Sequence, residues 1–181
     1  MARIAFVLGE DFEDSEFRKP YDALKEAGHH IDILGAKGTE KVKGKKGKEE
    51  VKLDGATTDK DASSYDALVI PGGYSPDHLR MDKDVVRFVG SFAKSNKLIA
   101  AVCHGPQLLI EADAVEDKTM TSWPSVHTDL VNAGAKWVDQ EVVVDRGLVS
   151  SRNPKDIPAF NRKMIEEFAE GRHDRKSGRA A

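Results

Sequence analysis

Short apolar runs alternate with longer amphipathic segments along most of the chain. The apolar runs are rich in Val, Ile, Leu and Ala and occupy residues 3–8, 30–34, 65–70 and 97–102. Segments with large apolar residues at helical spacing lie at 15–27, 83–94 and 106–112. Strands that are apolar on both faces and alternate with helices favour a mainly parallel sheet covered by helices on both sides.

The last part of the chain has a different pattern. Segments 141–144 and 148–151 flank Asp-Arg-Gly and predict a hairpin, and 158–170 predicts a closing helix. We therefore expect an α/β fold, a three-layer α/β/α sandwich with a flavodoxin-like sheet, formed by one domain over residues 1–170. Residues 171–181 are polar and basic, and we expect a flexible C-terminal tail there.

Composition narrows the class of protein. The chain has 181 residues, 33% of them charged, and a net charge of −3, which is too small to indicate a membrane or nucleic-acid partner. A single cysteine cannot form an internal disulfide or a cysteine zinc site, and this fits a reducing compartment. With no signal-peptide pattern, phosphate loop or dinucleotide fingerprint, we expect a cytoplasmic protein without a cofactor.

Residues 40–53 contain six lysines around glycine residues. This pattern predicts an exposed hairpin with solvated lysine side chains. A nucleic-acid patch is the alternative, but the segment lacks the aromatic residues that would stack on bases.

The cysteine, Cys103, follows a predicted strand directly and precedes a predicted helix. Small residues at Ala101 and Gly105 permit a sharp turn, which is the pattern of a nucleophile elbow with sulfur as the nucleophile. Such an elbow places the sulfur at the carboxyl edge of the sheet and directs a helix N-terminus at it, which stabilises a thiolate. The alternative is a buried structural cysteine.

Five segments in fixed order carry a resemblance. They are FEDSEF (12–17), VIPGGYSPDHLR (69–80), AVCHGPQLL (101–109), TSWPSVHTDLVNAGAKWVD (121–139) and EVVVDRGLVSSRNPKDIPAF (141–160). With them the chain resembles the PfpI family of intracellular cysteine-peptidase-like proteins. That family belongs to the superfamily with a class I glutamine-amidotransferase-like fold, which also contains the Parkinson-disease-linked deglycase.

The resemblance implies that Cys103 is the nucleophile, that His104 assists it, and that Glu13 is the acid beside the sulfur. A protonated carboxyl there can donate a hydrogen bond to a thiolate without adding a like charge. Three nearby carboxylates compete with Glu13 for this place: Glu10, Asp14 and Glu16.

Backbone groups complete the expected site. The N–H groups of Gly73 and His104 are expected to form an oxyanion hole, with Gly72 and Trp123 lining the pocket. A simple turn is the alternative interpretation of the glycine pair. His127 is a weak alternative to His104 as the histidine that assists Cys103, and we expect it to be a surface residue.

The resemblance also implies that the acid orienting His104 comes from a neighbouring subunit, at the position of Asp77, where glutamate is more familiar. Aspartate is one methylene shorter, so its reach is reduced. Because this acid is expected from a neighbouring subunit, we expect a homodimer, and the resemblance implies that dimers can assemble into hexamers.

Three functions use the same residues. The first is a stress-response, cysteine-dependent hydrolase or lyase of the glyoxalase or deglycase type, acting on small carbonyl compounds or glycated protein. The second is an intracellular cysteine peptidase. The third is a redox-sensitive stress chaperone that binds unfolded protein. The sequence favours the first.

Overall fold

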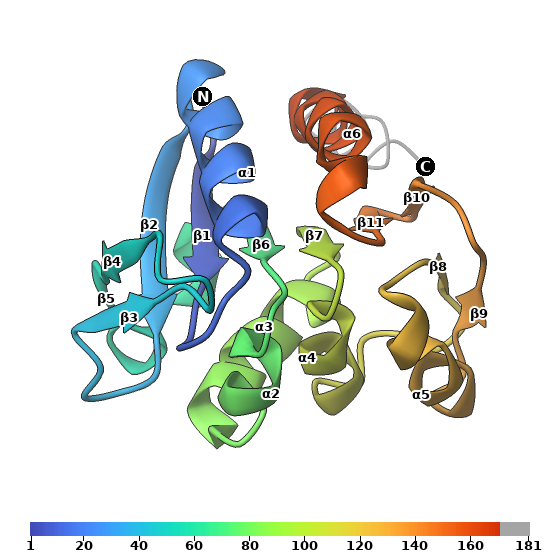
Figure 1. The fold of residues 1–181 in the computed structure, drawn as a ribbon, viewed down its shortest axis with the longest axis horizontal. Helices are drawn as coiled ribbons and strands as arrows, with labels where there is room; N and C mark the ends of the chain where they lie inside the picture. The colour runs from blue at the N-terminus through green and yellow to red at the C-terminus, as the bar shows by residue number, and fades with distance from the viewer. Residues whose placement is uncertain (171–181) are drawn as a thin grey trace, which may run out of the picture.

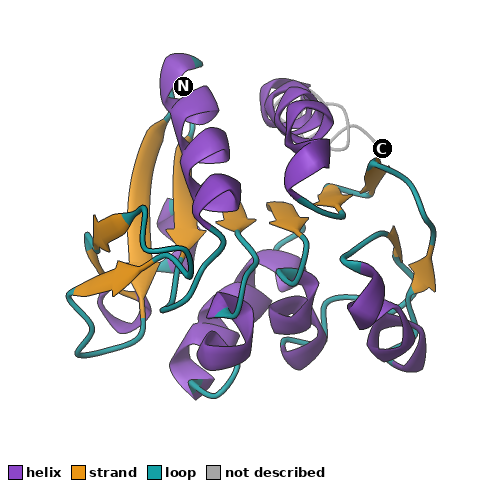
Figure 2. Cartoon of the chain, in the orientation of Figure 1, coloured by secondary structure: helices purple, strands orange, loops and turns teal. Residues whose placement is uncertain are grey.

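A seven-stranded sheet divides the molecule, and helices cover both of its faces (Figures 1 and 2). The computed structural model describes residues 1–170, so the predicted tail at 171–181 lies outside the described residues. The strands, in spatial order, are β10 (Val142–Asp145), β11 (Leu148–Ser151), β7 (Leu98–Val102), β6 (Ala67–Ile70), β1 (Arg3–Val7), β2 (His30–Gly35) and β5 (Gly55–Ala56). Neighbouring strands are parallel except β10 and β11, which form the predicted hairpin. The predicted α/β fold class is confirmed.

The helices form two layers, with one pair above the sheet in Figure 1 and the others below it. The upper pair is α1 (Asp14–Glu26) and α6 (Ile157–Glu170). The others are α2 (Ser75–Leu79), α3 (Lys83–Lys94), α4 (Pro106–Glu111) and α5 (His127–Asn132). None of the described helices is long and apolar enough to cross a membrane.

Strand β1 shows how the core is built on both faces. Ile4 and Phe6 belong to the cluster under α1 and α6, whereas Ala5 and Val7 belong to the cluster against α3 and α4. Alternate residues of a strand point to opposite faces of the sheet. Because helices cover both faces, all four side chains are fully buried. This explains the unbroken apolar runs in the sequence.

Two small sheets lie beside the main one. Strands β3 (Lys41–Lys43) and β4 (Glu50–Lys52) pair antiparallel, which confirms the predicted lysine-rich hairpin. Strands β8 (Thr119–Met120) and β9 (Lys136–Trp137) pair parallel. Isolated bridges join Phe12, after β1, to Gly44 in the hairpin and to Gly73 after β6. The carboxyl edge of the sheet therefore brings three distant segments together.

Candidate active site

The chain turns sharply between β7 and α4, and Cys103 sits at the turn. Its φ is +61°, in the left-handed region that residues other than glycine rarely adopt. The backbone N–H of Cys103 donates to Ser151 (2.9 Å) and its carbonyl accepts from Trp123 (2.9 Å). A Cβ on Gly105 would lie 2.5 Å from the Ile70 carbonyl oxygen, so only glycine fits there. The predicted nucleophile elbow is present.

The sulfur lies in a nearly closed environment, and Cys103 is 6% exposed. The backbone N–H groups of Gly73 and His104 lie beside the sulfur and lower the pKa of its thiol. The sequence predicted these two groups as donors to an oxyanion, and the structure directs both at Sγ. The Nδ1 atom of His104 lies 3.3 Å from the same sulfur.

The carboxyl group beside the sulfur belongs to Glu16, which is fully buried. Its Oε2 accepts the N–H of Gly72 at 3.0 Å, and its carboxyl group and the Cys103 thiol affect each other's pKa. A Cβ on Gly72 would lie 2.5 Å from this carboxylate and 2.8 Å from the Cβ of Cys103. Gly72 thus packs under the Glu16–Cys103 pair, and a larger residue would separate the two groups.

Burial controls the protonation of this pair. Burial raises the pKa of Glu16 to about 7. Burial and the charge of Glu16 raise the pKa of the Cys103 thiol, against the N–H groups of His104 and Gly73, which lower it. The sequence pattern predicted a stabilised thiolate. Burial and the Glu16 charge instead favour the neutral thiol, next to a carboxyl group whose pKa of about 7 suits it to exchange protons near neutral pH.

The prediction of Glu13 as the acid beside the sulfur needs correction. Glu13 precedes the first residue of α1, and its carboxylate pairs with Lys45 at 3.0 Å and Lys46 at 2.7 Å. Burial would raise the pKa of Glu13, but the hydrogen bonds and charges of the two lysines outweigh it and hold that pKa below its usual value. Glu16 lies further along α1, next to the buried Phe17, on the face that packs onto the sheet. In the sequence, the position of Glu16 next to the apolar Phe17 was the feature that could have indicated its burial.

His104 is held between an aromatic wall and a hydroxyl. Its ring stacks on Trp123, with centroids 6.2 Å apart, and its Nε2 lies 3.4 Å from Ser125 Oγ. Burial and the Lys45 charge lower the pKa of His104, while the charge of Asp77 raises it less. Asp77 is exposed on α2, and no hydrogen bond joins it to His104 within the described chain. The structure thus brings Trp123, but not the Asp77 carboxylate, into contact with the histidine.

His127 does not approach the sulfur. Its ring packs on Trp137, with centroids 4.5 Å apart, and its side chain is exposed.

A cavity of about 410 Å³ opens over the sulfur. It contains five residues that the sequence predicted for the site and others that it did not. Its lining is Glu13, Glu16, Lys45, Gly73, Tyr74, Cys103, His104, Trp123 and Pro154. Lys45 comes from the lysine-rich hairpin, where solvated side chains were predicted. Lys41, Lys43 and Lys45 are all exposed, as predicted. Lys41 and Lys43 pair with Glu50, whereas Lys45 pairs with Glu13 and also lines the cavity, which the sequence pattern did not indicate.

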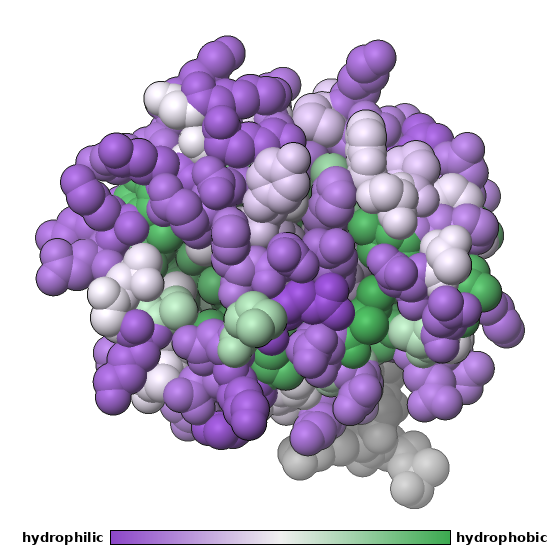
Figure 3. All heavy atoms as spheres, turned by 60° about the horizontal axis from the view of Figure 1, so that its bottom comes forward, coloured by the Kyte–Doolittle hydropathy of each residue, from purple (hydrophilic) through white to green (hydrophobic). Residues whose placement is uncertain are grey.

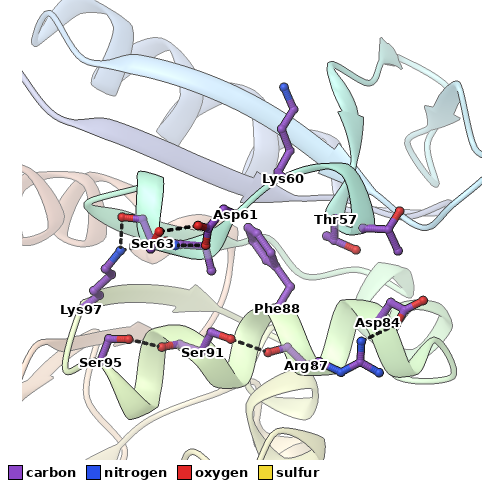
Figure 4. Close-up of a pocket in the computed structure, with 12 residues that line it drawn as sticks. Thr57, Lys60, Asp61, Ser63, Asp84, Arg87, Phe88, Ser91, Ser95 and Lys97 are labelled. Atoms are coloured by element: carbon purple, nitrogen blue, oxygen red, sulfur yellow. Dashed lines mark hydrogen bonds and ion pairs between the residues drawn. The ribbon is translucent and has the colours of Figure 1, made fainter.

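A second cavity, of about 510 Å³, lies between α3 and residues 57–63 (Figure 4). Its walls carry serine, threonine and charged side chains, and neither cysteine nor histidine lines it. Lys97 at one end donates to the carbonyl oxygens of Ala62, Ser63 and Tyr65. These contacts tie two segments of the fold together, and we assign this cavity no chemistry. Within the described residues, no group of three or more His, Cys, Asp or Glu side chains is placed to hold a metal ion.

Comparison with known proteins gives consistent matches over nearly the whole chain. The model of the DJ-1/PfpI family matches residues 2–167. General stress protein 18 of Bacillus subtilis is 48% identical over 164 residues, covering 90% of this chain and 95% of that protein. Protein/nucleic acid deglycase 2 of Escherichia coli is 44% identical with the same coverage. The putative cysteine protease YraA of Bacillus subtilis is 44% identical over 163 residues, covering 90% of this chain and 96% of that protein.

Solved structures agree. DJ-1 of Schizosaccharomyces pombe superposes with a TM-score of 0.80 at 26% identity, covering 91% of this chain and 90% of that one. A two-domain protein of Anabaena variabilis with DJ-1/ThiJ/PfpI-like and ferritin-like domains gives a TM-score of 0.91 at 41% identity. The match covers 93% of this chain but 48% of that longer one.

Proposed function

The chain belongs to the DJ-1/PfpI family, and from this premise we propose that it is a cysteine-dependent hydrolase acting on reactive carbonyl compounds, of the deglycase or glyoxalase type. One observation carries the proposal. The Cys103 thiol at a strained turn contacts the buried carboxyl of Glu16, whose pKa is about 7, at the floor of a small cavity. A group with this pKa is suited to accept a proton at neutral pH.

The first half of the reaction forms a bond from sulfur to the carbonyl carbon. As Sγ attacks, Glu16 accepts the thiol proton, and the carbonyl oxygen becomes an alkoxide. The N–H groups of Gly73 and His104 are the nearest donors for that charge. Return of the proton from Glu16 to the alkoxide gives a neutral hemithioacetal.

The second half releases the product. With a methylglyoxal-derived aldehyde, the hydrogen on the attacked carbon moves as a proton to the neighbouring carbon, which leaves a thioester. Water then cleaves the thioester to a hydroxy acid and the free thiol, and no oxidant is needed. His104 is neutral at pH 7 because its pKa is lowered, so it is able to accept the proton of that water.

The relatives do not distinguish a deglycase from a peptidase, because the protein named deglycase and the one named putative cysteine protease are each 44% identical to this chain. The cavity favours the deglycase. Its volume is about 410 Å³, and the side chains of Trp123 and Tyr74 line it. A small carbonyl compound therefore fits this cavity better than a peptide chain does.

A holdase requires broad exposed apolar surface. Figure 3 shows the lower side of Figure 1, where hydrophilic side chains cover most of the face and hydrophobic ones show between them. On the face that Figure 3 shows, this composition favours an enzyme over a chaperone.

The test compares wild type with Cys103→Ser on methylglyoxal, a glycated peptide and casein. We expect turnover of the first two substrates and its collapse in the variant, with little change in melting temperature. Casein cleavage that depends on Cys103 would favour the peptidase. Full carbonyl turnover without the thiol would end the proposal.

A further inference from the structure

Lys45 at the tip of the β3–β4 hairpin reaches into the nucleophile cavity. Its Nζ lies 3.0 Å from Glu13 Oε2 and 5.8 Å from the ring centre of Tyr74, another residue of the cavity wall. Its charge also interacts with Cys103. The reaction proposed above does not use the Lys45 ammonium group.

The hairpin tip is held firmly over the cavity. The Asp14 carboxylate accepts three backbone N–H groups, from Lys46, Lys48 and Glu49, at 2.9 to 3.0 Å. The N–H of Lys45 itself donates to the carbonyl of Phe12 at 2.9 Å. A ligand that binds Lys45 therefore does not have to order the loop first, which favours affinity.

The charges around the cavity leave Lys45 available to a ligand. Glu13 has a second partner in Lys46, at 2.7 Å, and that pair can persist when Lys45 turns to a ligand. Burial favours the neutral forms of Glu16 and His104. The side chain of Lys45 is 36% exposed, so incoming molecules can reach it.

Lys45 is an anion binder and not a nucleophile. Burial lowers its pKa, but the hydrogen bond and charge of Glu13 and the nearby Cys103 and Glu16 together raise it above the usual value. An ammonium that stays protonated cannot form a Schiff base, but it donates charge-assisted hydrogen bonds.

We propose, building on the function above, that Lys45 makes the cavity selective for reactive carbonyl compounds that carry a carboxylate, the class of 2-oxoaldehydes with an acid group. The ammonium binds the carboxylate while Cys103 attacks the carbonyl carbon. A single ammonium matches a single negative charge, since Lys46 does not line the cavity. The larger charge of a phosphate calls for more donors than the described lining offers.

Alkylation of Cys103 tests the charge preference without relying on turnover. Iodoacetate and iodoacetamide are similar in size and differ by one negative charge. The rate ratio of iodoacetate to iodoacetamide is measured in wild type, Lys45→Met, Lys45→Arg and Lys46→Met. Iodoacetamide reports any change in thiol reactivity itself, so the ratio isolates the effect of charge. Lys46→Met is the matched control, because it loses an ion pair to Glu13 from outside the cavity lining.

We expect Lys45→Met to lower this ratio about tenfold, as for loss of one charge-assisted hydrogen bond. Lys45→Arg should restore most of it, and Lys46→Met should leave it within about twofold of wild type, because Lys46 does not line the cavity. An unchanged ratio in Lys45→Met, or an equal fall in Lys46→Met, would overturn the inference.

Steady-state kinetics with a charged and a neutral substrate provide a second test of the role of Lys45. For 4,5-dioxopentanoate, a 2-oxoaldehyde that carries a carboxylate, kcat/KM should fall about tenfold in Lys45→Met, while kcat/KM for neutral methylglyoxal stays within about threefold. An equal loss for both substrates would assign Lys45 to the thiol and not to the substrate. If wild type turns over neither substrate, the proposed function fails, and the alkylation ratio still decides the role of Lys45.

Discussion

Replacing Glu16 by glutamine should weaken catalysis and strengthen the fold at the same time. Glutamine has nearly the same shape, its oxygen can accept the Gly72 N–H, and its amide can donate to the sulfur. It cannot accept the thiol proton. The variant therefore removes one proton acceptor and leaves the packing around Cys103 in place.

The stability effect follows from the raised pKa of Glu16. Burial raises this pKa from 4.5 to about 7 in the folded protein. Below pH 4.5 the carboxyl is protonated in both folded and unfolded chains. Between the two pKa values the unfolded chain loses the proton and the folded chain keeps it, so stability falls as pH rises. The loss reaches about 3 kcal/mol above pH 7, at 1.36 kcal/mol per pKa unit. Glu16→Gln escapes this loss.

The assay combines urea unfolding with steady-state kinetics at pH 5 and pH 8. Relative to wild type, the free energy of unfolding of Glu16→Gln should rise by about 2.5 kcal/mol between these pH values, because about 0.8 kcal/mol of the loss has already occurred at pH 5. Carbonyl turnover should fall by about 10²- to 10⁴-fold, as for loss of a general base. In wild type, kcat/KM should rise with pH through an inflection near 7.

Glu13→Gln provides the contrast. The pKa of Glu13 is lowered, so its stabilising effect is present above its unfolded pKa and is lost as pH falls through its folded pKa. Glu13→Gln should therefore destabilise the protein at pH 8, opposite in sign to Glu16→Gln, and should reduce turnover less. A pH-independent stability difference for Glu16→Gln, or a greater loss of turnover in Glu13→Gln, would refute our assignment.

Two further predictions concern the turn and the histidine. Gly105→Ala should destabilise the protein by about 1–3 kcal/mol in chemical denaturation, because its Cβ would lie 2.5 Å from the Ile70 carbonyl oxygen. Gly90→Ala in α3 has no contact closer than 3.6 Å and should be neutral or slightly stabilising, so equal losses would contradict the argument. Asp77→Asn should lower the His104 pKa further, measured by NMR titration, because the Asp77 charge raises it. Light scattering tests the predicted dimer, and a stable monomer at micromolar concentration would contradict it.

The pattern of apolar residues was sufficient for the fold because burial on both faces leaves no alternation in the strands. The elbow was also predictable, since a cysteine between a buried strand and Gly105 has few other interpretations. The choice between Glu13 and Glu16 was not. The two carboxylates lie within one helical turn, and only the position where α1 begins decides which of them faces the sheet.

Lys45 illustrates a second limit of sequence patterns. The glycine and lysine pattern predicts a hairpin, but not the direction in which it folds. That direction depends on Asp14, more than thirty positions earlier, whose carboxylate holds the hairpin backbone. The local sequence does not reveal such a long-range contact. Lys45, which lines the cavity, therefore could not be distinguished in the sequence from the other lysines of the hairpin.

The energetics of the site bear on whether Cys103 is merely structural. A left-handed φ at a residue other than glycine costs about 1–2 kcal/mol. A buried carboxyl with a pKa near 7 costs about 3 kcal/mol at neutral pH. A structural cysteine requires neither feature, because an ordinary turn and an apolar neighbour would pack a small side chain better. Together the two penalties are a substantial part of the 5–15 kcal/mol that stabilises a typical domain. A fold that retains both at one sulfur therefore favours selection for chemistry at Cys103 over selection for packing.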